Sequence, residues 1–280
     1  MSLRDRLLVL PQYLAPQHLL SRAVRWATRQ SWSTRLIAPF CERFRVDMSE
    51  AARPLHDYKS FNDFFTRHLR EGARPIAAGP GHLVCPADGA ISQFGPVQDG
   101  QLLQAKGHEF SLAALLGGLA DETQPLTRGH FITVYLSPRD YHRVHAPFDF
   151  QARELRFIPG ALFSVNDRTA RSVPDLYARN ERLVLLGNSP WGPAAFVMVG
   201  AMLVSSMTLE GFELDPIALS AQRLHQQPLQ PSLSFPQGAE VGRFNMGSTV
   251  ILVLPPGAPV WRNGLQPGIK VRMGELLAAD

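Results

Sequence analysis

Gly247 and Ser248, near the end of the chain, are residue types that allow a peptide bond to break itself. Gly247 has no Cβ, so it tolerates strained backbone angles and leaves its carbonyl carbon open to attack. The Ser248 hydroxyl can reach that carbon in a tight turn, provided that a base takes its proton and hydrogen-bond donors hold the oxyanion. Gly-Ser pairs more often mark an ordinary turn into a buried strand. Self-cleavage therefore requires a base from elsewhere in the chain.

Two further segments contain groups that such chemistry needs. Asp88 lies in a Cys-Pro-Ala-Asp-Gly stretch after an apolar run, although Asp-Gly by itself usually marks a turn. His142 and His145 lie in a Pro-bounded loop, 137–147, and loops held by a rigid strand commonly carry sites. An aspartate, a histidine and a serine are the members of a triad, but a triad is recognised by its geometry. The sequence alone leaves that arrangement open.

Other functions would use the same residues. His142 and His145 are residue types that bind metals, but no third ligand at metalloenzyme spacing accompanies them, so no metal is predicted. A serine hydrolase with Ser248 as its nucleophile is disfavoured because Gly-Ser-Thr lacks the G-x-S-x-G elbow. A non-catalytic, membrane-bound β scaffold stays open. The intact mass of the purified protein separates these alternatives, because self-cleavage gives two fragments that meet at 247/248.

The 280 residues have the composition of a folded globular protein, with 45% hydrophobic and 19% charged residues. The net charge of +4 suits nucleic acid or an anionic membrane. The arginines are dispersed without a basic stripe or a known module, so nucleic acid is not a predicted partner. Cys41 and Cys85 form no CxxC pair, which indicates a reducing compartment. We find no secretory signal and no apolar stretch of about 20 residues.

The part of the chain that carries the candidate groups is predicted to be β-rich. From residue 83 onward, short apolar runs are bounded by Gly and Pro, which favours many short strands. The run 250–254 is entirely apolar, so it must be an internal strand. A helix at 112–116, capped by Ser111 and stopped by Gly117, and another at 174–180 interrupt the strands. The predicted strands are 83–85, 89–94, 131–136, 152–158, 183–186, 195–199, 202–207, 250–254 and 269–273.

Helices are predicted for the first 60 residues and just after them. Apolar residues of 19–27 and 36–44 recur at helical spacing with arginines elsewhere on the wheel, which predicts two or three short amphipathic helices. These helices either pack on the core or anchor the protein at a membrane interface, where Trp26 and Trp32 among arginines are favoured. Ser60 is the predicted N-cap of a helix that runs through residue 70.

The predicted fold class is therefore α+β. Short amphipathic N-terminal helices pack on a β-rich, mostly antiparallel catalytic core, and the C-terminal segment completes that core.

Several sequence blocks between residue 61 and the C-terminus occur together in one known family. Each block alone is weak, but the histidine block combined with Gly-Ser-Thr is highly specific. The blocks are Phe-Asn-Asp-Phe-Phe-Thr-Arg (61–67) with Arg-Pro-Ile (74–76), Pro-Ala-Asp-Gly (86–89), Lys-Gly (106–107), Phe-Ser-Leu (110–112), Leu-Leu-Gly (115–117), Tyr-Leu-Ser-Pro-Arg-Asp-Tyr-His-Arg-Val-His (135–145) and Phe-Asn-Met-Gly-Ser-Thr (244–249). With these blocks the chain resembles the bacterial, pyruvoyl-dependent phosphatidylserine decarboxylases, which are made as proenzymes. Met246 departs from the leucine most often found there, an exchange that conserves volume.

The resemblance implies that Asp88, His145 and Ser248 form a charge-relay set that cleaves the Gly247–Ser248 bond. His145, with an ordinary pKa near ~6.5, would accept the Ser248 proton, and Asp88 would fix the tautomer of His145. The Ser248 hydroxyl would attack the Gly247 carbonyl carbon to give an ester. β-Elimination would then leave a dehydroalanine that hydrolyses to a pyruvoyl group and ammonia. The products are a large chain that ends at Gly247 and a small chain that starts at the converted Ser248.

The resemblance further implies a decarboxylase whose cofactor is the covalent pyruvoyl group at position 248. That group would form a Schiff base with the amine of phosphatidylserine and accept electrons as CO₂ leaves, which gives phosphatidylethanolamine. His142 is the candidate proton donor because it lies in the same loop. The expected domains are a helical membrane-associating region (1–60), a β-rich catalytic core (61–247) and the small chain of the same core (248–280).

A lipid substrate implies a membrane partner. The arginines and tryptophans of the N-terminal region suit an anionic membrane surface. We therefore expect a peripheral protein at the cytoplasmic face of the inner membrane, with phosphatidylserine as its substrate. The large and small chains are expected to stay associated as a heterodimer, and further dimerisation is left open.

Overall fold

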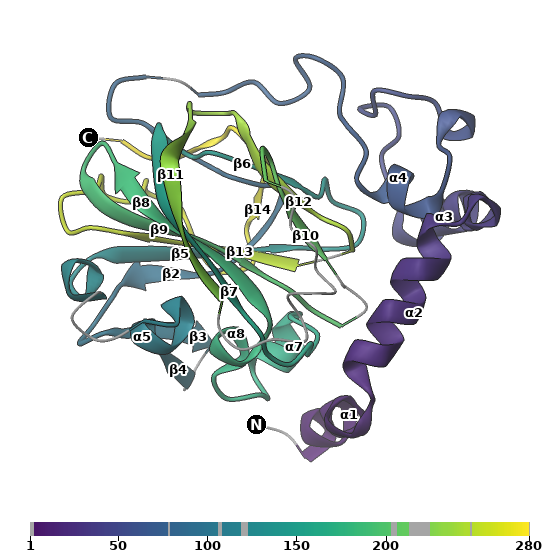
Figure 1. Ribbon diagram of the computed structural model, residues 1–280, viewed down its shortest axis with the longest axis horizontal. Helices are drawn as coiled ribbons and strands as arrows, with labels where there is room; N and C mark the ends of the chain where they lie inside the picture. Colours follow the sequence, from purple (N-terminus) through teal and green to yellow (C-terminus); the bar gives the residue numbers. More distant parts are fainter. Residues whose placement is uncertain are drawn as a thin grey trace.

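The computed structural model describes residues 3–77, 79–105, 108–118, 123–202, 206–212, 225–246 and 248–279. It shows helices at the N-terminal end and a large antiparallel sheet in the rest of the chain, which confirms the α+β class. In Figure 1 the N-terminal helices (purple) lie along one side of the molecule, beside the strands.

Within the described residues, eight strands form one antiparallel sheet in the order β11-β7-β8-β9-β13-β5-β2-β14. Strand β13 pairs with β9 on one side and with β5 on the other, so the prediction that 250–254 is an internal strand is confirmed. The strands span Gly89–Pro96 (β2), His130–Leu136 (β5), Phe150–Ile158 (β7), Arg182–Ser189 (β8), Gly192–Val199 (β9), His225–Phe235 (β11), Ser248–Leu254 (β13) and Lys270–Val271 (β14).

A smaller sheet, in the order β10-β12-β6, covers one face of the large sheet. Val144 and Phe244 of the smaller sheet share a buried cluster with Val134 and Val250 of the large one. Removal of these apolar side chains from water stabilises the two layers together. The strands of this layer span Arg143–His145 (β6), Met207–Leu209 (β10) and Glu240–Phe244 (β12), and the pair Leu83–Val84 (β1) with Leu276–Ala278 (β15) adds to the same core.

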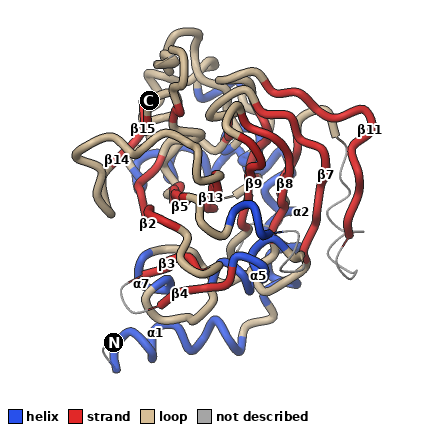
Figure 2. The backbone as a smooth tube through the Cα atoms, turned by 90° about the vertical axis from the view of Figure 1, so that its left-hand side faces the viewer, coloured by secondary structure: helices blue, strands red, loops and turns tan. Residues whose placement is uncertain are grey.

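The opposite face of the large sheet is covered by short helices and a hairpin (Figure 2). Helix α5 begins where Ser111 Oγ accepts a hydrogen bond from the Ala114 N–H at 3.2 Å, and it ends at Gly117, whose φ is 65°. Both ends of this helix are as predicted. The elements of this layer span Gln101–Ala105 (β3), His108–Ser111 (β4), Leu112–Leu116 (α5), Gln124–Leu126 (η3), Asp167–Ala170 (α7) and Leu176–Arg179 (α8).

The N-terminal helices confirm the amphipathic helices predicted for this region. Helix α2 buries Ser21 and Thr28 but leaves Leu19 66% and Trp26 64% exposed, so its apolar side does not pack on the core. No helix among the described residues is long and apolar enough to cross a membrane. The elements span Leu3–Leu14 (α1), Gln17–Arg29 (α2), Ser31–Leu36 (η1), Ile37–Phe44 (α3), Leu55–Asp57 (η2) and Phe61–Phe65 (α4).

Some predicted boundaries differ from the structure. The helix capped by Ser60 ends at Phe65 and not at residue 70, because the next residues turn and pair with residue 51. Of the predicted strand 202–207, residues 203–205 lie outside the described residues. Strand β11 was not predicted because it contains Pro228 and Pro231, which an edge strand tolerates.

Candidate active site

The candidate residues gather where three neighbouring strands of the large sheet begin or end. Ser248, the first residue of β13, pairs with Leu136, the last residue of β5. On the other side of β5, Ala90 of β2 pairs with Tyr135, so Asp88 lies just before this strand. Neighbouring strands are about 4.8 Å apart, so the backbones at 88 and 248 are about 10 Å apart across β5.

The loop that follows β5 is closed by its own aspartate. The Asp140 carboxylate accepts hydrogen bonds from the Ser137 N–H at 2.7 Å and from the Ser137 hydroxyl at 2.6 Å. The Asp140 N–H in turn donates to the Ser137 carbonyl oxygen at 2.9 Å. This closed turn sets the direction in which Tyr141 and His142 leave the sheet, and the chain then enters β6 with His145.

The segment before Gly247 is fixed against the histidine loop. The Phe244 N–H donates to the His142 carbonyl oxygen at 2.9 Å, and Asn245 Nδ2 donates to the Ser206 carbonyl oxygen at 3.1 Å. Met246 has a φ of 157°, a positive value that is uncommon for a residue with a side chain, and it packs against the aromatic cluster of α4. Gly247 and the side chain of Ser248 lie outside what the structure describes. The structure therefore brings His142 next to the segment that enters the expected cleavage site.

His142 is a neutral, buried histidine. Its Nδ1 lies 2.8 Å from the Asp140 carbonyl oxygen, an acceptor, so the ring proton is on Nδ1. Its Nε2 is buried and has no hydrogen-bond partner among the described residues. The Phe65 ring packs against the imidazole with 4.0 Å between ring centroids. Burial, with a further contribution from the Arg67 charge, lowers the pKa of His142 to about 3. Nε2 therefore carries a free lone pair and must take up a proton before it can donate one.

His145 has partners for both ring nitrogens. Nδ1 lies 2.8 Å from the Gly238 carbonyl oxygen, so it holds the proton, and Nε2 accepts a hydrogen bond from the Tyr141 hydroxyl at 3.0 Å. Burial lowers the pKa of His145, while the charges of Glu240 and Asp88 act in the opposite direction. The ring is a neutral base whose tautomer is fixed by a backbone carbonyl.

Asp88 is engaged by an arginine. Its carboxylate accepts hydrogen bonds from Arg74 Nε at 2.8 Å and from the Met273 N–H at 2.9 Å. Arg74 also donates to the Glu50 carboxylate at 2.8 Å. Among the described contacts of Asp88, none is a hydrogen bond to His145, so the orienting contact implied by the sequence resemblance is not made here. The segments that contain Asp88 and His145 are nevertheless adjacent, because the His145 N–H donates to the Pro86 carbonyl oxygen at 2.8 Å.

Comparison with known proteins identifies the family. A family model described as phosphatidylserine decarboxylase matches residues 61–279, a range that includes Asp88, both loop histidines and Ser248. The chain belongs to the phosphatidylserine decarboxylase family. The resemblance carried by the sequence blocks is thus confirmed, and the chain is a decarboxylase. A second family model, described as PSD, matches residues 7–45.

Curated relatives in this family are named phosphatidylserine decarboxylase proenzyme. One from Pseudomonas aeruginosa is 49% identical, over 99% of this chain and 98% of the relative. One from Albidiferax ferrireducens is 48% identical, over 98% of this chain and 97% of the relative. A relative from Hahella chejuensis is 46% identical, over 98% of this chain and 94% of its own length.

Sequence reasoning missed several contacts in this phosphatidylserine decarboxylase site. Tyr141 and Arg74 lie inside the blocks that carry the family resemblance, so their residue types were visible but their partners were not. Gly238 lies in a Pro-Gln-Gly turn, and nothing in that sequence indicates that its carbonyl oxygen receives the His145 proton. These contacts depend on tertiary structure, since Gly238 is 93 residues from His145.

Proposed function

We propose that this chain decarboxylates phosphatidylserine to phosphatidylethanolamine after it cleaves its own Gly247–Ser248 bond. The observation that carries the proposal is the hydrogen bond from the Phe244 N–H to the His142 carbonyl oxygen, at 2.9 Å. It holds the segment entering Gly247 against the histidine loop, and the same loop starts at β5, the strand that pairs with Ser248. The family match and the names of the relatives support the substrate and the precursor form.

For self-cleavage we assign Ser248 as the nucleophile, His145 as the base and Asp88 as a charge that favours protonated His145. The Tyr141 hydroxyl occupies the Nε2 lone pair of His145, so we place Tyr141 in the path of the proton. It gives its own proton to Nε2 as it takes the proton of Ser248. Burial raises the pKa of Tyr141 well above its usual range, which suits a hydroxyl that stays protonated on both sides of this transfer.

Position 248 fits the pyruvoyl group that this cleavage would leave. Residues 249–253 pair with both β9 and β5, so a chain that starts at 248 would stay fixed in the sheet. The buried Nε2 of His142, unpartnered among the described residues, belongs to the loop held against this segment. A pyruvoyl group supplies a sink for the electrons left when CO₂ departs.

His142 would move the proton in that reaction. The ammonium group of phosphatidylserine must lose a proton before it can act as a nucleophile, and the lone pair of His142 Nε2 can take it. The same proton is then available for the substrate Cα once CO₂ has left. Burial lowers the pKa of His142 to about 3, so uptake of the proton from the ammonium group is uphill, and the protonated ring then releases its proton readily to Cα.

We also propose that the N-terminal region docks on an anionic membrane at the cytoplasmic face of the inner membrane. The apolar side chains that α1 and α2 leave exposed support this, since Leu14 is 80% and Leu19 66% exposed. Leu19→Gln with Trp26→Gln should reduce co-sedimentation with phosphatidylglycerol vesicles. Val260→Gln, which changes a 75% exposed residue on another part of the surface, is the matched control. Equal binding of all three proteins would contradict the proposal.

Intact mass and CO₂ release test the enzymatic proposal together. The purified protein should consist of two fragments that meet at 247/248 and stay together on native gel filtration as a heterodimer. It should release CO₂ from phosphatidylserine dispersed in detergent. Ser248→Ala should remain a single chain without activity. A single uncut wild-type chain, or two fragments that release no CO₂, would overturn the proposal.

A further inference from the structure

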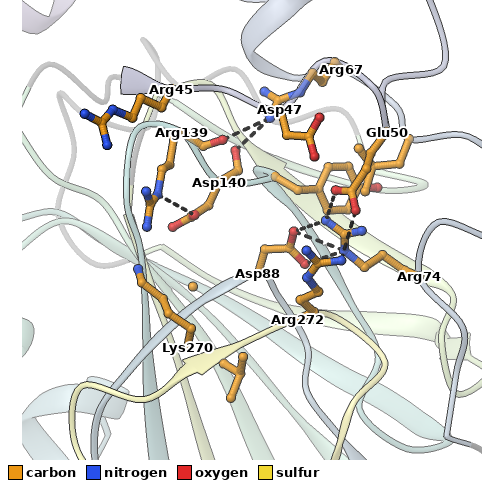
Figure 3. Close-up of a pocket in the computed structure, with 14 residues that line it drawn as sticks. Arg45, Asp47, Glu50, Arg67, Arg74, Asp88, Arg139, Asp140, Lys270 and Arg272 are labelled. Atoms are coloured by element: carbon orange, nitrogen blue, oxygen red, sulfur yellow. Dashed lines mark hydrogen bonds and ion pairs between the residues drawn. The ribbon is translucent and has the colours of Figure 1, made fainter. Parts of the chain in front are cut away.

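A pocket of about 270 Å³ opens beside Asp88 and is unusually rich in cations (Figure 3). Six basic side chains and four carboxylates line it, so the lining carries a net positive charge. The basic residues are Arg45, Arg67, Arg74, Arg139, Lys270 and Arg272, and the acidic ones are Asp47, Glu50, Asp88 and Asp140.

The charges are unevenly paired across this pocket. On one side, Arg74 and Arg272 bind Glu50 and Asp88, with nitrogen-to-oxygen distances of 2.5 to 3.0 Å. On the other side, Figure 3 shows Arg45, Arg139 and Lys270. Arg139 lies 3.8 Å from an oxygen of Asp140, which is also held by Ser137. Within the described part of the chain, Arg45 and Lys270 form no ion pair. The excess positive charge is therefore concentrated on one side.

Arg67, which also lines the pocket, is a buried cation that forms no ion pair with a carboxylate among the described residues. It is 3% exposed, and its NH2 group donates to the carbonyl oxygens of Arg139 and Asp140 at 3.1 and 3.4 Å. Its Nε and NH1 are buried and have no partner among the described residues. Arg182, by contrast, is as buried but donates from all three nitrogens to carbonyl oxygens. A buried guanidinium that no carboxylate pairs is costly even with the Phe64 ring centroid 5.3 Å from its central carbon, and an anion in the pocket would offset part of that cost.

We infer that this pocket binds the phosphate of the phospholipid substrate, with Arg45, Arg139 and Lys270 as its contacts and Arg67 as the buried charge behind them. The inference rests on the proposed function. Phosphate is favoured over the serine carboxylate for a chemical reason. A cation paired with the carboxylate would stabilise the ground state and oppose the loss of CO₂, whereas the phosphate keeps its charge throughout the reaction.

The pocket lies at a suitable place for this role. Tyr141 forms part of its wall, and the hydroxyl of Tyr141 is bonded to His145. In the substrate, only an ester oxygen and the serine Cβ separate the phosphorus from the reacting Cα. A phosphate held in the pocket would therefore fix the headgroup next to the histidine loop, and it would contribute to substrate binding more than to the chemical step.

The test uses two double variants with the same change in charge. Arg45→Gln with Lys270→Gln removes cations from the pocket, and Arg128→Gln with Arg153→Gln removes two exposed arginines from elsewhere. Each pair is placed in the full-length Ser248→Ala chain, and binding of glycerophosphoserine, inorganic phosphate and free serine is measured by calorimetry. We expect the pocket variant to weaken glycerophosphoserine binding about tenfold or more, and the control to leave it unchanged. Free serine should bind more weakly than glycerophosphoserine to the unaltered pocket.

The same pairs in the self-processing protein separate binding from chemistry. The pocket variant should raise the KM for dispersed phosphatidylserine about tenfold with kcat within about twofold of wild type. Equal effects of the two pairs on binding would overturn the inference, even if wild-type protein releases CO₂ normally. Binding of inorganic phosphate without binding of glycerophosphoserine would also overturn it, because the site would then hold free phosphate and not the headgroup. Absence of CO₂ release by wild type would instead contradict the proposed function, and calorimetry would still decide the phosphate site.

Discussion

Removal of Arg74 from its buried ion pair with Asp88 should destabilise the protein far more than removal of the arginine from an exposed pair of the same chemistry. Its side chains are 7% and 9% exposed, and Arg74 also binds Glu50. Arg74→Met would keep the length of the side chain but leave Asp88 without a guanidinium partner and Glu50 with Arg272 alone. Removal of one partner of a buried pair costs about 3–5 kcal/mol, because the remaining charge is left without compensation.

The pair of Arg53 with Asp63 provides the matched control. It has the same residue types and a nitrogen-to-oxygen distance of 2.6 Å, but its side chains are 38% and 32% exposed. Exposed pairs contribute about 0–1 kcal/mol, so Arg53→Met should change the free energy of unfolding by no more than that. Both substitutions are made in Ser248→Ala, so that differences in self-cleavage do not affect the comparison.

Urea unfolding of the two variants measures the difference directly. The free energy of unfolding should fall by about 3–5 kcal/mol for Arg74→Met and by about 0–1 kcal/mol for Arg53→Met. Addition of Asp88→Asn to Arg74→Met should recover part of the loss, because one uncompensated charge disappears. Similar losses for the two single variants, or a further loss with Asp88→Asn, would refute the reasoning.

Three further predictions concern single residues. Tyr141→Phe should slow self-cleavage by about 10²-fold or more, because the proton path to His145 is lost. Gel analysis of the decay of the precursor measures this rate. Decay at the wild-type rate would show that Tyr141 is not in the proton path. His142→Ala should be cleaved normally but release CO₂ poorly, and an uncut His142→Ala chain would place His142 in the cleavage step instead. Burial raises the pKa of Glu181 from 4.5 to about 7, so the folded state holds a proton that the unfolded state has released over this range. Stability should therefore fall as the pH rises from about 4.5 to about 7, by about 3 kcal/mol, and then level off. Urea unfolding at pH 5 and pH 8 should show this fall in wild type and not in Glu181→Gln, and parallel behaviour of the two would contradict it.

Strands with continuous apolar runs could be predicted from the sequence, and those without them could not. Apart from half-buried Tyr135, the runs 131–136 and 250–254 are buried on both faces of the large sheet, so their sequence needs no alternation and is easily recognised. Strand β6 has only three residues, and arginine and histidine are two of them. It is a strand because it pairs with β12, almost 100 residues later in the chain. Local sequence carries no information about such a partner.

The sequence also did not predict which face of the N-terminal helices is buried. Helical spacing predicted their amphipathic character, and it left open whether the apolar side meets the core or the surroundings. The structure buries Ser21 and Thr28 of α2, and the Thr28 hydroxyl donates to the Val24 carbonyl oxygen at 2.8 Å. The apolar side therefore remains exposed. Periodicity defines which residues share a face, but the packing partner decides which face is buried.

The sequence indicates residue types for the candidate site, but it does not indicate their contacts. Asp88, His145 and Ser248 were expected to act as a relay in which the carboxylate fixes the imidazole tautomer. The structure gives that task to the Gly238 carbonyl oxygen, which leaves the Asp88 carboxylate to Arg74. The Asp88 charge still favours protonated His145, although burial acts against it. A charge acts through space and a hydrogen bond needs contact, so the aspartate can assist the histidine from beside it while it also holds one wall of the cationic pocket.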